Sequence, residues 1–251
     1  MPLAIDVSNY SGPISSTQAR ALVEAGVRRV VVGTQAPRAP YPPCAVAQQI
    51  PTLLDAGIEA HAYVYLWLAE DGAAQVRAAL DLVEPWRERI GRLWLDVEDT
   101  TATALSLAER LARVRAATAA AGAMPVGIYT ARWFWREAMA DTMACAALPL
   151  WVAEYDGRAD LAFPAFGGWT VAAMKQYAAD ATVAGVPCVD LDWYEADVPA
   201  LSEAEFGWAF AALYRGLAPG QLPIDVRWGV PTRDADGTEV HPLVVRGRPG
   251  A

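Results

Sequence analysis

The sequence predicts an α/β fold, a TIM-like barrel in which five strand–helix units precede three strands with few helices. Short runs rich in β-branched residues alternate with helix-type runs through the first half of the chain, a pattern typical of a parallel sheet covered by helices. Eight expected strands favour a closed barrel, and a length of 251 residues suits one. An open doubly wound sheet is the alternative, although no glycine-rich phosphate loop follows the first strand.

The five strand–helix units occupy the first 145 residues. Their strands are expected at 3–7, 27–32, 58–66, 93–97 and 126–129, and their helices at 17–25, 44–56, 72–90, 101–121 and 132–145. Gly26, Gly57 and Gly122 follow the ends of three of these helices, and glycine is the usual residue after a helix C-terminus. The pattern then changes, and strands are expected at 150–154, 170–177 and 188–191.

The last part of the chain is expected to contain a final helix of the barrel and then a separate C-terminal extension. A final helix is expected at 202–215, where Ser202 and Glu205 form a capping box. Residues 1–215 are therefore assigned to the barrel and residues 216–251 to a C-terminal extension. That extension carries two strand-like runs, 224–230 and 240–245, around an Asp-Gly turn, which predicts a β-hairpin with a frayed end.

Composition excludes several function classes. A net charge of −9 argues against nucleic acid as a partner, because phosphate binding needs a basic surface. The three cysteines are widely spaced, without a CxxC pair or a nearby histidine cluster, so neither a disulfide framework nor a metal site is expected. No apolar run is long enough to span a membrane. Residues 1–6 lack the features of a signal peptide, which predicts synthesis in the cytoplasm without a cleavable export signal.

Acidic residues follow the expected strands at the end where barrel enzymes keep their catalytic groups. Asp6 ends the first strand, Asp96 and Glu98 end the fourth, and Asp190 lies on the eighth. Side chains two apart on a strand share a face, so Asp96 and Glu98 should both point to the barrel axis. Carboxyl groups crowded in a cleft acquire different pKa values, as glycoside cleavage requires.

Two further acids are expected to have ordinary roles. Asp99 comes just before an expected helix, which predicts that it caps or flanks the helix N-terminus. Asp192 is expected to be a solvated carboxylate.

Five motifs, in order along residues 3–200, resemble glycoside hydrolase family 25, the Chalaropsis-type lysozymes. The opening run Ile5-Asp6-Val7-Ser8-Asn9-Tyr10-Ser11-Gly12 resembles the family's first-strand signature, and Trp94 to Glu98 its D-x-E strand. The other three are Gly127 to Thr130, Pro149 to Tyr155, and Gln176-Tyr177 with Gly185 to Leu191, the last similar to the closing W-Q-Y and V-D-L-N stretch.

The resemblance implies a barrel of five βα units plus three strands and N-acetylmuramidase activity, which hydrolyses the β-1,4 bond after N-acetylmuramic acid in peptidoglycan. It makes Glu98 the general acid and Asp96 the partner of the substrate's 2-acetamido group, with Asp6 and Asp190 holding the acid and the sugar in place. It assigns substrate binding to Tyr63, Tyr129, Trp151, Tyr155 and Gln176. No cofactor is implied. The resemblance does not cover residues 216–251, which are expected to form a surface flap with a frayed end, and the alternative is a docking element for a protein partner.

Three departures from the family pattern keep alternatives open. The K-A-T-E-G run of the second strand is Val32-Gly33-Thr34-Gln35-Ala36 here and keeps only the threonine. The third-strand Y-H-F is Tyr63-Val64-Tyr65, and the closing W-Q-Y is Lys175-Gln176-Tyr177. One alternative is a catalytically weak or inactive barrel that binds wall glycans as a phage or cell-surface subunit. Another is a hydrolase of a chitin-like or capsular polymer. The surviving D-x-E pair favours hydrolysis. The expected lack of a signal peptide and the tail after residue 216 fit a phage or prophage lysin that acts on the cell wall.

Overall fold

The computed structural model describes residues 3–34 and 43–195, together with four short strands between residues 224 and 247. The chain divides into two compact units, Met1–Ala196 and Asp197–Ala251. The predicted helix at 202–215 lies outside the described residues, so the predicted domain boundary after residue 215 stays a prediction.

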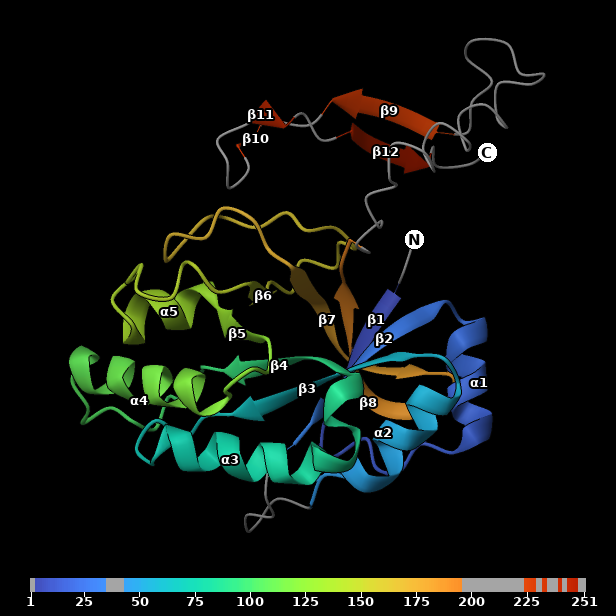
Figure 1. Cartoon of the computed structure of the whole chain (residues 1–251), viewed down its shortest axis with the longest axis horizontal. Helices are drawn as coiled ribbons and strands as arrows, with labels where there is room; N and C mark the ends of the chain where they lie inside the picture. The colour runs from blue at the N-terminus through green and yellow to red at the C-terminus, as the bar shows by residue number, and fades with distance from the viewer. Residues whose placement is uncertain are drawn as a thin grey trace. The chain divides into compact units, whose positions relative to one another are not determined.

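The first unit is a closed eight-stranded barrel in which each strand pairs with the next one along the chain (Figure 1). This confirms the predicted fold class. The strands are β1 (Leu3–Val7), β2 (Val27–Gly33), β3 (Glu59–Tyr65), β4 (Ile90–Asp96), β5 (Val126–Ala131), β6 (Leu150–Ala153), β7 (Met174–Val183) and β8 (Val186–Trp193).

The eighth strand departs from the parallel arrangement that strand–helix alternation implies. Strands β1 to β7 pair in parallel, whereas β8 runs antiparallel to both β7 and β1. Only Ala184 and Gly185 connect β7 to β8, and both have positive φ, 53° and 77°. Two residues in this conformation form a tight hairpin turn, and a parallel crossover would need a dozen or more. As a result, β8 closes the barrel by placing Asp190 directly opposite Asp6.

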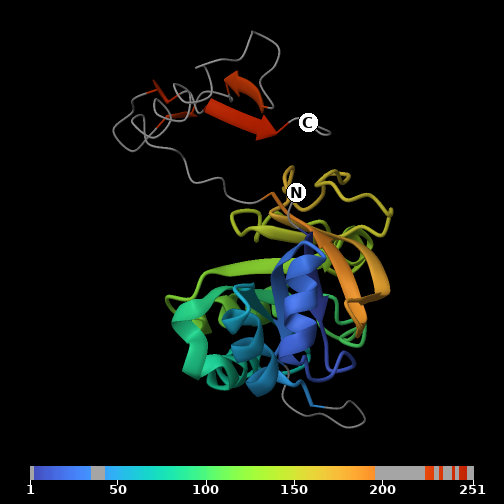
Figure 2. The same cartoon turned by 90° about the vertical axis from the view of Figure 1, so that its right-hand side faces the viewer.

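Helices cover the outside of the barrel (Figures 1 and 2). They are α1 (Ser16–Glu24), α2 (Val46–Asp55), α3 (Gly72–Val83), the 3₁₀ helix η1 (Glu84–Arg89), α4 (Leu107–Ala120) and α5 (Arg132–Ala138). The predicted helix 72–90 changes to a 3₁₀ helix at Glu84 because Pro85 has no N–H and fits only the first turn of a new helix. None of the described helices has the length and apolar character needed to cross a lipid bilayer.

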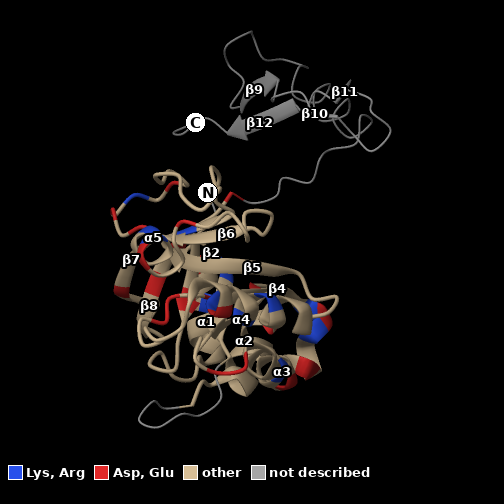
Figure 3. Cartoon of the chain, turned by 90° about the vertical axis from the view of Figure 1, so that its left-hand side faces the viewer, with Lys and Arg blue, Asp and Glu red and all other residues tan. Residues whose placement is uncertain are grey.

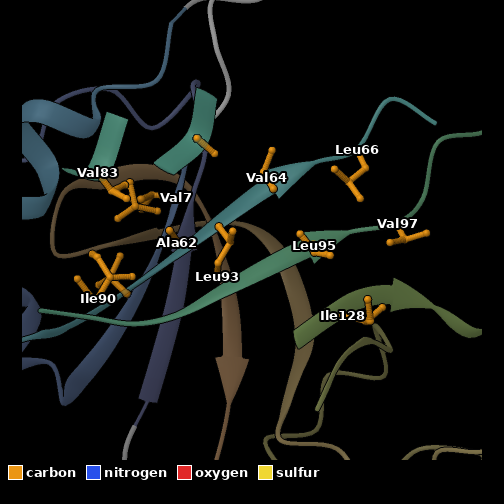
Figure 4. Packing of buried hydrophobic residues seen from close by; sticks show 14 of the residues in the cluster. Val7, Ala62, Val64, Leu66, Val83, Ile90, Leu93, Leu95, Val97 and Ile128 are labelled. Carbon is orange, nitrogen blue, oxygen red and sulfur yellow. The ribbon is translucent and has the colours of Figure 1, made fainter. Parts of the chain in front are cut away.

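The alternation of side chains along the strands separates two apolar layers. On β4 and just beyond it, Leu93, Leu95 and Val97 point outward and pack in the layer between sheet and helices (Figure 4). Trp94 points inward and packs with Trp151, Tyr129 and other residues inside the barrel. The ring centroids of Trp151 lie 4.4 Å from Tyr129 and 5.8 Å from Trp94. This aromatic layer fills the barrel interior, so any ligand must bind above it, at the mouth.

One glycine makes room for the aromatic layer. A Cβ atom on Gly127 of β5 would lie 2.3 Å from Cζ3 of Trp94, closer than any real contact between carbon atoms. The glycine in the fifth-strand motif is therefore explained by packing.

The described residues of the second unit form four short strands, β9 (Ile224–Trp228), β10 (Thr232–Arg233), β11 (Glu239–Val240) and β12 (Leu243–Gly247). Strand β9 pairs antiparallel with β12, and β10 pairs antiparallel with β11. Arg233 and Glu239 are paired with each other across β10 and β11.

Candidate active site

A cavity of about 300 Å³ lies at the carboxyl ends of the parallel strands. All nine residues predicted for the site line it, namely Asp6, Tyr63, Asp96, Glu98, Tyr129, Trp151, Tyr155, Gln176 and Asp190. Acidic residues on β7 and β8 appear red in Figure 3. The structure therefore brings together residues from seven strands and from the segments that follow them.

Four more residues line the cavity that the sequence did not single out, Ser8, Tyr10, Asp180 and Cys188. Ser8 and Tyr10 continue the alternation that begins at Asp6, so two-residue spacing beyond the first strand is a signal that could have found them. Tyr10 is 59% exposed and Tyr155 is 60% exposed, which leaves both rings accessible at the rim. Asp180 and Cys188 have positive φ in a pair of strands with shifted register, and no local pattern predicts their positions.

Gln176 on β7 links the acids of the cavity to two of its tyrosines. Its Nε2 donates to Oδ2 of Asp6 at 2.7 Å and to Oδ2 of Asp190 at 3.1 Å. Its Oε1 accepts from the hydroxyl groups of Tyr129 at 2.7 Å and Tyr155 at 2.6 Å. An amide has two N–H donors and two lone pairs, so this buried side chain is fully satisfied by protein partners. The arrangement fixes two carboxyl groups and two phenols relative to one another.

The acids raise one another's pKa because they share a partly dry cavity. Burial, with the nearby charge of Asp190, raises the pKa of Asp6 to about 7, even though the hydrogen bond from Gln176 acts to lower it. Burial, followed by the charges of Glu98 and Asp6, raises the pKa of Asp96 well above its usual range. The pKa of Glu98 is also raised, by burial and by Asp190. The cavity therefore holds protons on some of its carboxyl groups at neutral pH.

Asp96 and Glu98 differ in what surrounds them. Asp96 is the last residue of β4, is 5% exposed, and has a buried oxygen, Oδ1, with no hydrogen-bond partner in the part of the chain that the structure describes. Glu98, two residues further on, is only partly buried. A partly accessible acid with a raised pKa can donate a proton to a ligand, and an unpaired buried oxygen can accept a hydrogen bond from one.

The expectations for Asp99 and Asp192 were wrong. Asp99 is 3% exposed; its Oδ2 accepts from the backbone N–H of Leu68 at 2.8 Å and its Oδ1 from the N–H of Thr101 at 2.8 Å. It thus joins the loop after β3 to the loop after β4, while Ser106 caps α4. Asp192 is completely buried, and its Oδ1 accepts from Nε1 of Trp151 at 2.8 Å. Both predictions failed because other parts of the chain bury these two side chains.

Metal-assisted catalysis would need several side chains arranged to coordinate a metal ion. Within the described residues, no group of three or more His, Cys, Asp or Glu side chains is arranged to hold a metal ion. The described residues that line the cavity bring carboxyl and phenol groups to it, together with the hydroxyl of Ser8, the amide of Gln176 and the thiol of Cys188.

A barrel with paired carboxyl groups and exposed aromatic rings at its mouth defines the class of the protein as a glycoside hydrolase of the barrel type. The family model described as glycosyl hydrolases family 25 matches residues 5–186 of the 251. The chain belongs to this family, as the sequence motifs predicted.

Curated relatives match parts of the chain. A protein named probable GH family 25 lysozyme 3, from Dictyostelium discoideum, is 32% identical over 111 residues, which cover 42% of this chain and 23% of the relative. Lysozyme-like protein 5 of Caenorhabditis elegans is 32% identical over 127 residues, 48% of this chain and 58% of the relative. Counting factor 50 of Dictyostelium discoideum is 36% identical over 107 residues, 41% of this chain and 35% of the relative. The matches thus span less than two thirds of each relative's length.

Solved structures share the fold at low sequence identity. A family 25 glycosyl hydrolase from Bacillus anthracis superposes with a TM-score of 0.65 at 13% identity, covering 79% of this chain and 90% of the other. A bacterial lysozyme from Streptomyces coelicolor gives a TM-score of 0.61 at 21% identity, covering 78% and 93%. At these identities the likeness establishes the fold, and the function rests on the site.

Proposed function

We propose that this protein is a peptidoglycan hydrolase, an N-acetylmuramidase that cleaves the β-1,4 bond after N-acetylmuramic acid in the glycan strands of the cell wall. The observation that carries the proposal is the convergence of Asp6, Asp96, Glu98 and Asp190 in one cavity at the barrel mouth. Membership of glycosyl hydrolases family 25 supports it.

Glu98 is the general acid in this proposal. Its carboxyl group lines the cavity, and burial together with the charge of Asp190 raises its pKa. A raised pKa keeps the carboxyl group protonated at higher pH, so that it can donate its proton to the glycosidic oxygen as the bond to the anomeric carbon breaks.

Asp96 is the partner of the substrate's acetamido group. Asp96 lines the cavity, and its Oδ1 has no hydrogen-bond partner among the described residues, which supports a role for this carboxyl group in accepting the acetamido N–H. That hydrogen bond would align the acetamido carbonyl oxygen, which forms a bond to the anomeric carbon as the glycosidic bond breaks. The positive charge on the resulting oxazolinium ring favours the ionised form of Asp96. Water then opens the ring, with the Glu98 carboxylate taking the proton of the attacking water.

The aromatic side chains supply the surface on which sugar rings bind. Tyr10 and Tyr155 are exposed at the rim, and Trp151 lies at the floor, 1% exposed. Pyranose rings have apolar faces and polar edges, which match the face of an aromatic ring surrounded by hydrogen-bonding groups. This arrangement also serves a barrel that only binds glycans, so the complete set of carboxyl groups is what favours hydrolysis.

Mass-spectrometric analysis of products from purified peptidoglycan tests the proposal. We expect soluble muropeptides whose reducing ends are N-acetylmuramic acid, and none from a Glu98→Gln variant treated in the same way. Reducing-end N-acetylglucosamine or 1,6-anhydro-muramic acid would contradict the assigned bond or reaction. Absence of products, with retained binding to the insoluble wall, would favour the binding-only alternative.

A further inference from the structure

Asp192 lies on β8 beneath the cavity and does not line it. Its backbone pairs with Ala4 of β1 and Gln176 of β7, so its side chain enters the barrel interior next to Asp6. The side chain is completely buried. Its Oδ1 accepts a hydrogen bond from Trp151, but its Oδ2 is buried without a donor among the described residues.

The groups around Asp192 give its carboxylate no compensating charge. The titratable side chains that interact with it are Asp6 on β1, Asp190 on the same strand and Tyr177 on β7. None of the ion pairs found between described residues includes it. The ammonium of Lys175, which precedes the cross-strand partner of Asp192 on β7, binds Asp156 and Asp160 instead. A lone carboxylate would therefore be buried beside other acids.

Burial without a counter-charge drives a carboxylate to bind a proton. The carboxyl group of Asp192 is within hydrogen-bonding reach of Asp6, and two carboxylates at that distance do not both ionise. Asp6 is the better site for the negative charge, because it borders the cavity and accepts from Nε2 of Gln176. In agreement, burial raises the pKa of Asp192 well above its usual range, and the charge of Asp6 raises it further.

We propose that Asp192 is a neutral carboxylic acid whose O–H donates to Asp6 while its other oxygen accepts from Trp151. It is a positioning residue: it holds Asp6 at the cavity wall and Trp151 at the cavity floor through one side chain. Asp6 then receives a donor on each side, one from Gln176 and one from Asp192. The consequence for catalysis rests on the proposed function, but the protonation state does not.

The protonation state is tested on the unmodified protein by NMR titration of its ¹³C-labelled aspartate side chains. We expect the carboxyl carbon of Asp192 to keep the chemical shift of a protonated acid as the pH rises through 3.8, the ordinary value for aspartate. A titration step at that pH would overturn the proposal. No substrate is involved, so this result is decided whether or not the protein cleaves peptidoglycan.

The positioning role is tested with two variants of similar size. Asp192→Asn keeps an oxygen for Trp151 and an N–H for Asp6, whereas Asp192→Leu has neither. We expect the leucine variant to lose at least about tenfold in kcat/KM, equivalent to ~1.4 kcal/mol, and the asparagine variant to regain most of that loss. Equal losses in both variants, with circular dichroism showing both folded, would contradict the role.

Discussion

Asp96 and Glu98 are separated by a single residue, yet the structure gives them different surroundings. Both side chains face the cavity, as two-residue spacing on a strand requires. Asp96 is enclosed by the barrel wall, and Glu98 lies beyond the end of β4, where solvent reaches it. The difference in enclosure favours a proton donor at Glu98 and a hydrogen-bond acceptor at Asp96.

Replacing the proposed acid should lower turnover by orders of magnitude and leave the fold intact. Glu98→Gln retains the shape of the side chain but cannot donate a carboxylic proton, so kcat/KM should fall about 10²–10⁴-fold. Asp96→Asn should also be severe, because the acetamido group loses its acceptor. Glu24→Gln, an exposed change at the end of α1, is the matched control. Clearing of peptidoglycan suspensions measures all three, and wild-type rates for both site variants would refute the assignment.

The pH dependence of kcat/KM should report the raised pKa of Glu98. Activity requires the protonated form, so it is present below the pKa of Glu98 and is lost as the pH rises through it. Because burial and the charge of Asp190 raise this pKa above 4.5, the basic limb should lie above that value. Asp190→Asn removes the neighbouring charge, which should shift the basic limb to lower pH. A limb that stays in place or moves to higher pH would show that another group controls it.

At the level of helices and strands, the sequence pattern of a segment predicted those features that the segment's own geometry determines. The alternation along β4 predicted that Asp96 and Glu98 both point to the barrel axis, and the alternation of strands and helices predicted the first five units. The antiparallel direction of β8 depends on the two-residue turn at Ala184 and Gly185. The alternation of strand-type and helix-type runs, from which the fold was predicted, does not give the length of the turns. The contacts of Gln176 come from three other strands and a loop, so its place at the centre of the hydrogen bonds had no signal in its own segment.

The sequence did not show which of the charged residues are buried in the folded protein. Asp99 and Asp192 read as ordinary surface acids, but neighbouring loops and strands enclose them. Lys175, where the family pattern has a tryptophan, is also fully buried. Its ammonium donates to Asp156 at 2.8 Å, to Asp160 at 3.0 Å and to the carbonyl oxygen of Ala162 at 3.0 Å. This departure from the family pattern therefore holds the loop that follows β6.

That loop carries Tyr155 at the cavity rim, so loosening the loop should weaken substrate binding. Lys175→Met keeps the buried stem but removes three charge-assisted hydrogen bonds, each worth roughly 1.5–3 kcal/mol. We expect KM to rise about 3–10-fold with a smaller change in kcat, since ~1.4 kcal/mol corresponds to tenfold. Limited proteolysis should cut this variant between residues 154 and 162.

Arg158→Met is the matched control for this change. It removes an ion pair to Asp160 in the same loop, but the Arg158 side chain is 66% exposed. Exposed pairs contribute little, so KM should remain near that of the wild type. Equal effects of the two variants would show that the buried lysine has no special role in the loop.

At the level of the whole molecule, the barrel closes within residues 3–193, because β8 pairs with β1. Among the described residues, its two apolar layers are formed by side chains from residues 3–194. The fold class could be predicted because hydrophobic alternation is repeated in many segments, so an error in one element boundary does not change the architecture. No repeated sequence pattern of this kind indicates the role of residues 216–251. We propose that they bind a protein partner.

Truncation after Arg215 separates the roles of the two parts. Because the barrel closes without the later residues, the shortened chain should fold and cleave soluble glycan fragments at rates close to those of the full chain. Any assembly seen for the full chain by size-exclusion chromatography with light scattering should be lost. A truncated chain that does not fold would show instead that the extension completes the structure of the barrel.

The central claim is that Glu98 and Asp96 act together on an N-acetylated sugar bound at the barrel mouth. A crystal structure of the Glu98→Gln variant with a tetrasaccharide of alternating N-acetylglucosamine and N-acetylmuramic acid tests it most directly. We expect the scissile glycosidic oxygen within about 3 Å of the amide of residue 98, a hydrogen-bonding distance for proton transfer. The acetamido N–H of the adjoining N-acetylmuramic acid should donate to Oδ1 of Asp96. A tetrasaccharide bound away from this cavity, or with its acetamido group turned from Asp96, would contradict the account.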